Sequence, residues 1–349
     1  MNLLVTGATG FLGSALVPLL AGEGHRLRLF QRSPALEAEK RGAEVLRGSV
    51  EDEGAVRAAL AGVDAVYHLA GQVSFDPEDP RALYALHVDG TRRLLEAAAD
   101  AGVKRVILAS SSGTIAVSRE ERLATEADDY PISVVGGWPY YLSKIYQEKT
   151  ALRIHRDTGL PVVILNPSLL LGPGDARLSS TDVVFKFLEK RIPAMPTGGL
   201  SFVDVRDAAR AFVAALSKGR PGERYLLGGA NMRFKDFFGR LERISGVPAP
   251  RITLPSEVNL AGARLLEKFH SWRGSEPPLD VHSTEMGERW WYCDSRKAER
   301  ELGFEARDPQ ETLYETVRWV EENVRKRRRP STVEDLGAAA APPPPRGRG

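Results

Sequence analysis

Short apolar runs alternate with segments of helical spacing along the first half of the chain. The apolar runs cover residues 2–6, 27–30, 43–46, 64–70 and 103–110. The segments with helical spacing between them include residues 14–21, 52–60 and 80–101. Short, continuously apolar runs are typical of buried parallel strands. Their alternation with helices predicts an α/β fold with a doubly wound parallel sheet of the Rossmann type.

A glycine-rich turn lies between the first strand and the first helix. Gly7 allows a tight turn, Gly10 lets a pyrophosphate approach the backbone, and Gly13 lets the helix pack closely on the strand. The helix N-terminus offers N–H groups and a positive dipole end to phosphates. A glycine triplet in this context predicts a dinucleotide site rather than an ordinary turn.

The pattern loosens after residue 165. Helices are predicted at 182–191, 207–216 and 310–323, and over 234–272 with a proline-rich interruption at 247–255. Trp272, Trp290 and Trp291 are expected in the core rather than around a pocket. Residues 326–349 are basic and then rich in alanine and proline, which predicts a disordered tail.

Composition narrows the class of protein. The 349 residues are 42% hydrophobic with a formal net charge of +2, which favours neither a nucleic-acid partner nor a membrane surface. The only cysteine, Cys293, excludes an internal disulfide, and the six histidines have no metal-ligand spacing. No apolar run is long enough to span a bilayer. We expect a cytoplasmic protein with a small-molecule substrate and no metal.

The position after the second strand selects between the two nicotinamide cofactors. An acidic residue there binds the ribose hydroxyls of NAD, whereas a basic residue meets the 2′-phosphate of NADP. This chain has Arg32 and no acid, and Arg28 or Arg41 could assist. NADP is therefore favoured, with NAD as the alternative, although a single arginine is also an ordinary loop charge.

Candidate catalytic residues follow the fifth strand. Ser110, Ser111 and Ser112 end it, and Tyr140 and Lys144 share one face of a later helix that Pro139 begins. Lowering a tyrosine pKa by about 3 units needs roughly 4 kcal/mol, which Lys144, a positive nicotinamide and the helix N-terminus could share. The Tyr-x-x-x-Lys spacing alone is also common in purely structural helices.

Several motifs in order resemble the extended short-chain dehydrogenase/reductase family, in particular dihydroflavonol-reductase-like and hopanoid-associated sugar-epimerase-like bacterial members. The matching segments are 6–13, 68–71, 103–111, 140–144, 166–174, 202–207, 222–229 and 297–303. The resemblance implies a Rossmann core over 1–165, to which segments such as 202–229 return. It also implies a smaller C-terminal substrate-binding domain, mainly from 166–325, and a monomer or homodimer.

The resemblance also implies residue roles. Ser111 would hold the substrate oxygen, Tyr140 would act as acid and base, and Lys144 would lower the tyrosine pKa. The implied cofactor contacts are Thr6, Gly7, Thr9, Gly10, Phe11, Leu12, Gly13, Arg32, Ser49, Val50, Leu69, Ala70, Gly71, Tyr140, Lys144 and Pro167, and the implied substrate contacts are Ser112, Asn166 and Ser168. The chain departs from the family pattern at Ser49, His87 and Asn166, where relatives often have aspartate, asparagine and arginine.

These features together predict an NADP-dependent oxidoreductase that acts on a carbonyl or a secondary alcohol. The main alternative is a nucleotide-sugar epimerase or dehydratase, which would use the same three residues but retain its cofactor. A second alternative is a non-catalytic NADP-sensing protein, although such relatives tend to lose the tyrosine or the lysine.

Overall fold

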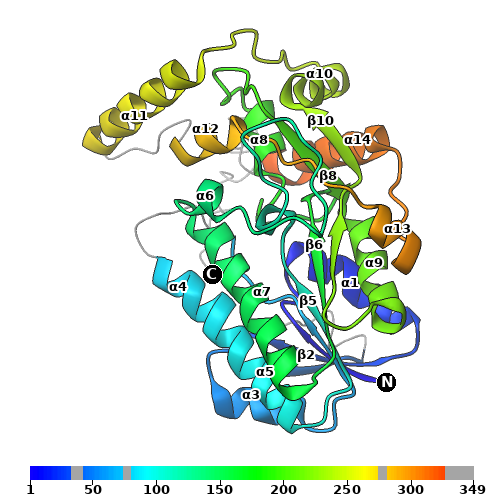
Figure 1. The fold of residues 1–349 in the computed structure, drawn as a ribbon. Coiled ribbons are helices and arrows are strands. Elements are labelled where there is room, and N and C mark those ends of the chain that lie inside the picture. The colour runs from blue at the N-terminus through cyan, green and yellow to red at the C-terminus, as the bar shows by residue number, and fades with distance from the viewer. Residues whose placement is uncertain (33–41, 74–79, 274–280, 327–349) are drawn as a thin grey trace, which may run out of the picture.

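A computed structural model of the chain describes residues 1–32, 42–73, 80–273 and 281–326. Its centre is a seven-stranded parallel sheet (Figure 1), which confirms the predicted doubly wound α/β fold. In spatial order the strands are β3 (Glu44–Arg47), β2 (Arg26–Gln31), β1 (Asn2–Thr6), β4 (Ala65–His68), β5 (Arg105–Ala109), β6 (Val162–Pro167) and β9 (Arg224–Leu227). Because all seven run in the same direction, their carboxyl ends lie along one edge.

Side chains that alternate along the strands build a hydrophobic core on each face of the sheet. In β1, Leu3 and Val5 pack toward one face and Leu4 toward the other, and all three are fully buried. The first face is covered by α1 (Phe11–Gly22) and α9 (Val205–Lys218). The second is covered by α3 (Glu53–Leu60), α5 (Thr91–Asp100) and α7 (Pro139–Thr158).

The long helix predicted over 80–101 is interrupted by a wider turn. It consists of α4 (Pro80–Tyr84), a π-helical segment η1 (Ala85–Gly90) and α5. Within η1, His87 is fully buried, and Gly90 lies against Val50 so closely that a Cβ would approach the valine to 2.7 Å. π-helical turns inside α-helices are frequent at functional sites. Here the turn brings His87 toward α7.

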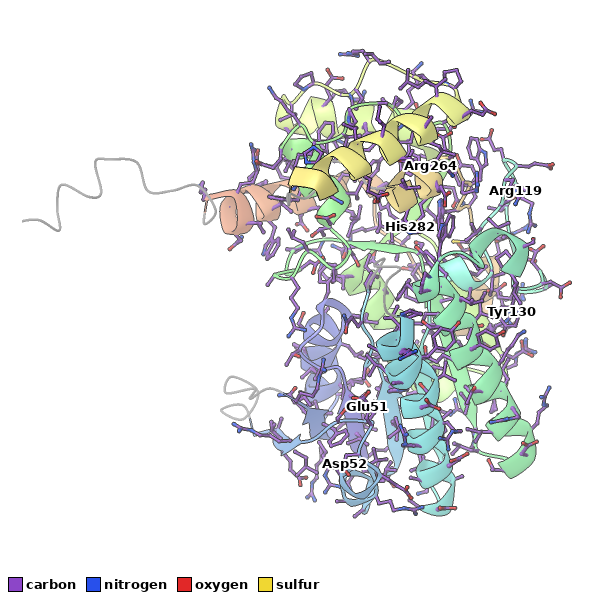
Figure 2. All side chains as sticks on the ribbon, turned by 90° about the vertical axis from the view of Figure 1, so that its left-hand side faces the viewer. Glu51, Asp52, Arg119, Tyr130, Arg264 and His282 are labelled. Carbon is purple, nitrogen blue, oxygen red and sulfur yellow. The ribbon has the colours of Figure 1, made fainter. Side chains whose placement is uncertain are left out.

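A second, three-stranded sheet lies beyond the carboxyl edge of the first. It consists of β10 (Ala230–Arg233), β8 (Gly199–Asp204) and β7 (Leu169–Leu171). Its core includes side chains from α8 (Asp182–Leu188), α10 (Phe234–Ser245) and α14 (Pro309–Val320). Arg264 and His282 lie at the opposite end of the molecule from Asp52, at the start of α3 (Figure 2).

The remaining elements are short, apart from one projecting helix. They are η2 (Ser112–Thr114), α6 (Ile132–Val135), α11 (Ser256–Arg273), α12 (Val281–Gly287), α13 (Arg296–Leu302) and η3 (Glu321–Arg325). The α10 and α11 helices bear out the two helices and the interruption predicted over 234–272. The α11 helix projects from the body (Figure 1). Apart from Lys326, the predicted tail lies outside the described residues.

Gly13 and Gly22, near the two ends of α1, offer a matched test of how closely this helix packs on the turn after β1. A Cβ at Gly13 would lie 2.4 Å from the carbonyl oxygen of Gly7, whereas one at Gly22 would meet nothing within 4 Å. We expect Gly13→Ala to lower the free energy of unfolding by about 1–3 kcal/mol, because backbone must shift. Gly22→Ala should raise it by roughly 0.5–1 kcal/mol. Urea titrations of both variants measure the difference, and equal effects would contradict this account.

Candidate active site

The turn after β1 is too tightly packed for a side chain at two of its three glycines. Gly7 has φ of 71°, and a Cβ there would lie 2.6 Å from the carbonyl carbon of Leu69; Gly13 is equally crowded. At Gly10 a Cβ would meet only the Gly7 carbonyl oxygen, at 3.3 Å. Gly10 is the N-cap of α1 and no side chain caps the helix, so its first N–H groups are available to an anion.

The other residues expected around this turn have distinct positions. Thr6 is fully buried at the end of β1, and Phe11 and Leu12 are buried in the first turn of α1. Thr9 is exposed. Leu69, Ala70 and Gly71 follow β4 directly; the first two are half-buried and Gly71 is exposed. The structure therefore brings the two glycine-containing segments together at the carboxyl edge.

The end of β2, where cofactor choice is expected, carries Gln31 and Arg32. Arg32 is exposed. Gln31 is only 6% exposed, and neither polar atom of its amide has a hydrogen-bond partner within the described ranges. Buried polar atoms normally have partners, so an amide here fits a ligand with hydroxyl groups. Nearby, Ser49 donates its hydroxyl to Glu51 over 3.2 Å, and Val50 is buried.

Arg28 does not assist at this end of the sheet, contrary to expectation. Its guanidinium donates to the Glu44 carboxylate at 2.9 Å and to the carbonyls of Ala59 and Ala61. The side chain is therefore committed to contacts within the protein. Arg41, the other candidate, lies outside the described residues.

Ser111 and Tyr140 meet beyond the end of β5. Ser111 has extended backbone and is the N-cap of η2, where its hydroxyl accepts from the Gly113 N–H at 3.2 Å. Tyr140 lies in the first turn of α7, which begins at Pro139 as expected, and is 9% exposed. Burial is the larger influence on the Tyr140 pKa and raises it, whereas the nearby Ser111 hydroxyl favours the ionised phenol and lowers that pKa.

Lys144 lies one turn further along α7 and is 5% exposed. Its ammonium donates to the carbonyl oxygen of Ala109 at 3.0 Å and to Oε1 of Gln147 at 2.9 Å. A Cβ on Gly71 would lie 3.5 Å from the ammonium nitrogen. Lys144 thus lies between the end of β5 and the glycine that follows β4.

Burial dominates the pKa shifts of Tyr140 and Lys144. It raises the pKa of Tyr140 to about 12. Burial also lowers the pKa of Lys144 to about 8, against an opposing effect of the Glu148 charge. The Lys144 ammonium is held by Ala109 and Gln147. The predicted lowering of the Tyr140 pKa counts on a positive nicotinamide as well as on Lys144 and the helix N-terminus.

The residues expected at the substrate are closely packed. Ser112 is 5% exposed and opens η2. Asn166 is fully buried, and its side-chain nitrogen donates to the Ser111 carbonyl, Thr114 and Glu148. Its Oδ1 and the Ser168 hydroxyl have no hydrogen-bond partner in the described part of the chain. A direct substrate contact from Asn166 would therefore have to come from Oδ1. Pro167 ends β6 between them.

A buried chain of hydrogen bonds connects Lys144 to the glycine turn, and the sequence motifs did not identify it as a unit. Gln147 donates its amide to the Thr91 hydroxyl at 2.7 Å while accepting from Lys144. His68 bridges Thr91 at 2.9 Å and Thr6 at 2.8 Å. All the links except Lys144 are fully buried. Spacing alone could have placed only Gln147, because it lies on the same helical face as Lys144.

His87, a departure from the family pattern, is also held on both ring nitrogens. Its Nε2 accepts from the Gln72 N–H at 3.1 Å, so Nδ1 carries the proton and donates to Ser143 at 2.8 Å. Ser143 in turn donates to the Tyr140 carbonyl oxygen. Burial and the Lys144 charge lower the His87 pKa to about 2. His87 is therefore a neutral support of the first turn of α7.

Aromatic side chains pack beside the Ser111 turn. Trp291 stacks on Trp138 with ring centroids 5.7 Å apart and lies 5.1 Å from Tyr141. A Cβ on Gly113 would approach Tyr141 to 2.2 Å. Trp291 belongs to a hydrophobic cluster, as the core interpretation expects. Trp290, half-buried, contacts Tyr292; the side chain of Trp272 lies outside the description.

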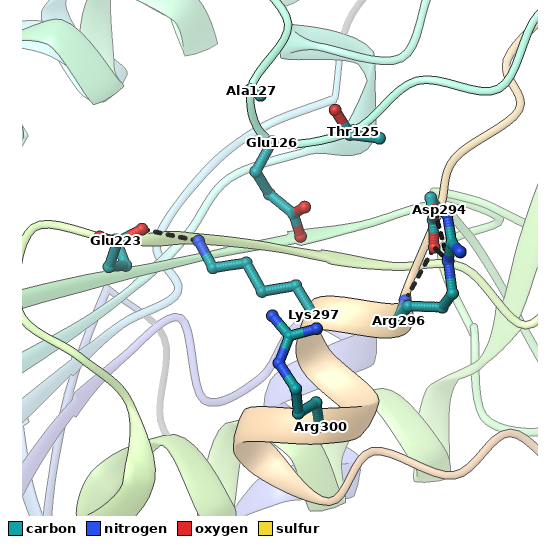
Figure 3. Close-up of a pocket in the computed structure, with 8 residues that line it drawn as sticks. All are labelled: Thr125, Glu126, Ala127, Glu223, Asp294, Arg296, Lys297 and Arg300. Atoms are coloured by element: carbon teal, nitrogen blue, oxygen red, sulfur yellow. Dashed lines mark hydrogen bonds and ion pairs between the residues drawn. The ribbon is translucent and has the colours of Figure 1, made fainter.

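A separate pocket lies beyond β9 and contains none of the candidate catalytic residues (Figure 3). Two ion pairs lie within it: Lys297 with Glu223 at 2.7 Å, and Arg296 with Asp294. Across the described ranges, His, Cys, Asp and Glu form no group suited to a metal ion. None of the described helices combines the length and the apolar character that crossing a bilayer requires.

Comparisons with known proteins agree with this geometry. A family model described as the NAD dependent epimerase/dehydratase family matches residues 3–228. A Synechocystis protein with the provisional name dihydroflavonol 4-reductase is 31% identical over 324 residues, 91% of this chain and 94% of that protein. Sterol demethylase protein B of Methylococcus capsulatus is 32% identical over 92% of this chain and 99% of that protein. The crystal structure of a nucleoside-diphosphate-sugar epimerase from Pseudomonas aeruginosa is 27% identical with a TM-score of 0.75, over 93% and 98%.

The fold and these relatives define an NAD(P)-dependent enzyme of the extended short-chain dehydrogenase type. The chain belongs to the NAD dependent epimerase/dehydratase family. The resemblance inferred from its motifs is thereby confirmed.

The neutral state of His87 predicts a dependence of stability on pH. Its pKa is about 2 in the folded protein against an ordinary value of 6.5, so below pH 6.5 the unfolded chain binds a proton that the folded chain does not. Stability from this group is therefore present above pH 6.5 and falls by about 1.4 kcal/mol per pH unit below it. We expect His87→Asn to reduce the slope by that amount between about pH 6 and pH 4.5 in urea titrations. Unchanged slopes would show that His87 is not held neutral.

Proposed function

We propose that the protein is an NADP-dependent oxidoreductase that interconverts a carbonyl and a secondary alcohol. The observation that carries this proposal is the Ser111 hydroxyl placed near the phenol of Tyr140, with Lys144 one helical turn away in α7. These groups lie at the carboxyl edge of the parallel sheet, where ligands bind in open α/β folds. The glycine turn opens at the same edge.

The residues of the chain divide the chemistry among themselves. Tyr140 gives its phenolic proton to the carbonyl oxygen, and Ser111 holds that oxygen by a hydrogen bond. The Lys144 charge stabilises the phenolate that remains. A bound nicotinamide cofactor supplies the hydride. Because burial disfavours the phenolate, the proposed chemistry requires positive charge near it, from Lys144 and from the bound nicotinamide.

Cofactor binding would use three parts of the same edge. The open backbone at Gly10 and the start of α1 would hold the pyrophosphate. Gln31 would bond ribose hydroxyls, and the exposed Arg32 would meet the 2′-phosphate. Arg47, which pairs in register with Gln31, adds a second cation at this position.

The epimerase or dehydratase alternative is supported by the likeness to the Pseudomonas nucleoside-diphosphate-sugar epimerase. The two functions differ in the fate of the hydride. A reductase transfers it from the cofactor to the substrate with net oxidation of the cofactor, whereas an epimerase returns it to the substrate it came from. Purified protein should therefore be examined for retained nicotinamide and for net oxidation of added NADPH with carbonyl compounds. Stoichiometric retention without net oxidation, but with isomerisation of sugar nucleotides, would overturn the reductase proposal.

Tyr140→Phe tests the proposed acid. Removing the hydroxyl leaves the ring but no proton donor, so we expect turnover to fall by about 10²–10⁴-fold. Affinity for the cofactor, measured by fluorescence titration, should change by less than about two-fold because the proposed phosphate contacts lie elsewhere. Tyr141→Phe is the matched control and should retain most activity, although Tyr141 packs against Gly113. An active Tyr140→Phe enzyme would exclude this mechanism.

Arg32→Gln tests cofactor choice. Losing a charge-assisted contact to phosphate should weaken NADP binding by about 10–100-fold and leave NAD binding nearly unchanged. Arg26→Gln removes the same charge from the opposite end of β2 and serves as the control. Equal weakening of both cofactors by Arg32→Gln, or no weakening, would contradict the assignment to NADP.

A further inference from the structure

A carboxylate is buried directly behind the Ser111 turn. Glu148 lies one turn after Lys144 in α7 and is fully buried. An ionised carboxylate in such a place is costly unless donors surround it. One of its oxygens, Oε1, has three neighbours that can donate: the hydroxyls of Ser110 and Thr114, and the side-chain nitrogen of Asn166. The Thr114 hydroxyl is 2.7 Å away and the Asn166 nitrogen 2.6 Å away.

These donors bracket Ser111 on both sides. Ser110 precedes it, and Thr114 follows it at the end of η2. Asn166 also donates to the carbonyl oxygen of Ser111 itself, at 3.2 Å. The single proton of the Thr114 hydroxyl lies between two acceptors, Oε1 of Glu148 and the Ser111 carbonyl oxygen at 2.8 Å. The residues before and after Ser111 are therefore held, through their side chains and Asn166, by one carboxylate oxygen of Glu148.

The second oxygen of Glu148 faces a cation. Its Oε2 lies 3.8 Å from Nη1 of Arg224, at the start of β9, and neither atom has a hydrogen-bond partner in the described part of the chain. Arg224 is fixed independently, because it donates to the Glu126 carbonyl oxygen at 2.7 Å and lies over the ring of Tyr130, which Figure 2 labels. Glu148 thus joins α7, the Ser111 turn, β6 and β9.

We propose that Glu148 is a positioning residue that fixes the Ser111 turn, and with it the hydroxyl that meets Tyr140. This inference rests on the proposed roles of Ser111 and Tyr140. Glu148 does not touch the reacting atoms; it acts through Ser110, Thr114 and Asn166. Both of its oxygens face donor groups, the hydroxyls and amide around the Ser111 turn on one side and the Arg224 guanidinium on the other, so the position requires two acceptors, which a carboxylate supplies.

Glu148→Gln keeps the shape of the side chain but cannot satisfy both sides. Its amide nitrogen must face either Arg224 or the three donors of the turn. We expect the turn to loosen and the Ser111 hydroxyl to move relative to the Tyr140 phenol. Asp207→Asn is the matched control, because Asp207 is also a buried carboxylate in ion pairs, with Arg307 and Arg210, but it lies in α9.

The primary measurement needs no substrate. Protein labelled with ¹³C at the ζ carbon of tyrosine gives a Tyr140 resonance that is assigned by its loss in Tyr140→Phe. In Glu148→Gln this resonance should move toward its position in Ser111→Ala, whereas Asp207→Asn should leave it in place. A resonance that stays at the wild-type position in folded Glu148→Gln overturns the proposal, whether or not the reductase function holds.

Kinetics provide the second measurement. With the carbonyl substrate and NADPH of the Tyr140→Phe assay, kcat should fall by roughly 10–100-fold in Glu148→Gln, since small misplacements of a catalytic group have effects of that size. The dissociation constant of NADPH should change by less than about two-fold. If Glu148→Gln lowers only the thermal stability, as we expect of Asp207→Asn, then Glu148 has a structural role and the proposal is wrong. If Glu148→Gln does not fold, Ser110→Ala and Thr114→Val remove single donors, and each should shift the Tyr140 resonance partway.

Discussion

The buried polar face of α7 is the constraint on which the site depends. A helix that packs against a sheet normally presents apolar side chains to it, but α7 presents Tyr140, Lys144, Gln147 and Glu148, all nearly or fully buried. Each needs partners, and most of these come from the ends of different strands, whereas Gln147 bonds Thr91 at the start of α5. Tyr140 has Ser111 after β5, and Lys144 has Ala109 at the end of β5. Gln147 has Thr91 and, through it, His68 of β4. Glu148 has Asn166 of β6 and Arg224 of β9.

This arrangement links the register of the sheet to the geometry of the candidate site. A continuous series of hydrogen bonds runs from Thr6 through His68 and Thr91 to Gln147. It connects β1, the strand before the glycine turn, to α7, the helix that carries Lys144. An unpaired buried polar group costs about 1–3 kcal/mol. A slip of α7 along the sheet would break several such bonds together, which favours one position of the helix.

Much of the architecture could be predicted because it follows from local patterns. Apolar runs and glycine spacing located the parallel strands and the turn at Gly7, and the Tyr140–Lys144 spacing located one helical face. What could not be predicted depends on contacts distant in sequence. Arg28 carries the same charge as Arg32, yet it pairs with Glu44 in the neighbouring strand. Glu148 looks like any surface glutamate of a helix until Ser110 and Asn166 are placed around it.

The electrostatics of Lys144 follow from how its neighbours are used. His68 and His87, which face it from β4 and η1, are both kept neutral by burial and by the lysine charge itself. Glu148, the carboxylate whose charge reaches it, directs its oxygens at the Ser111 turn and Arg224 instead. No ion pair to Lys144 is found within the described ranges, where its ammonium bonds only neutral oxygens. Its positive charge is therefore not neutralised by an ion pair there, and under the proposed mechanism it is left to stabilise the phenolate of Tyr140.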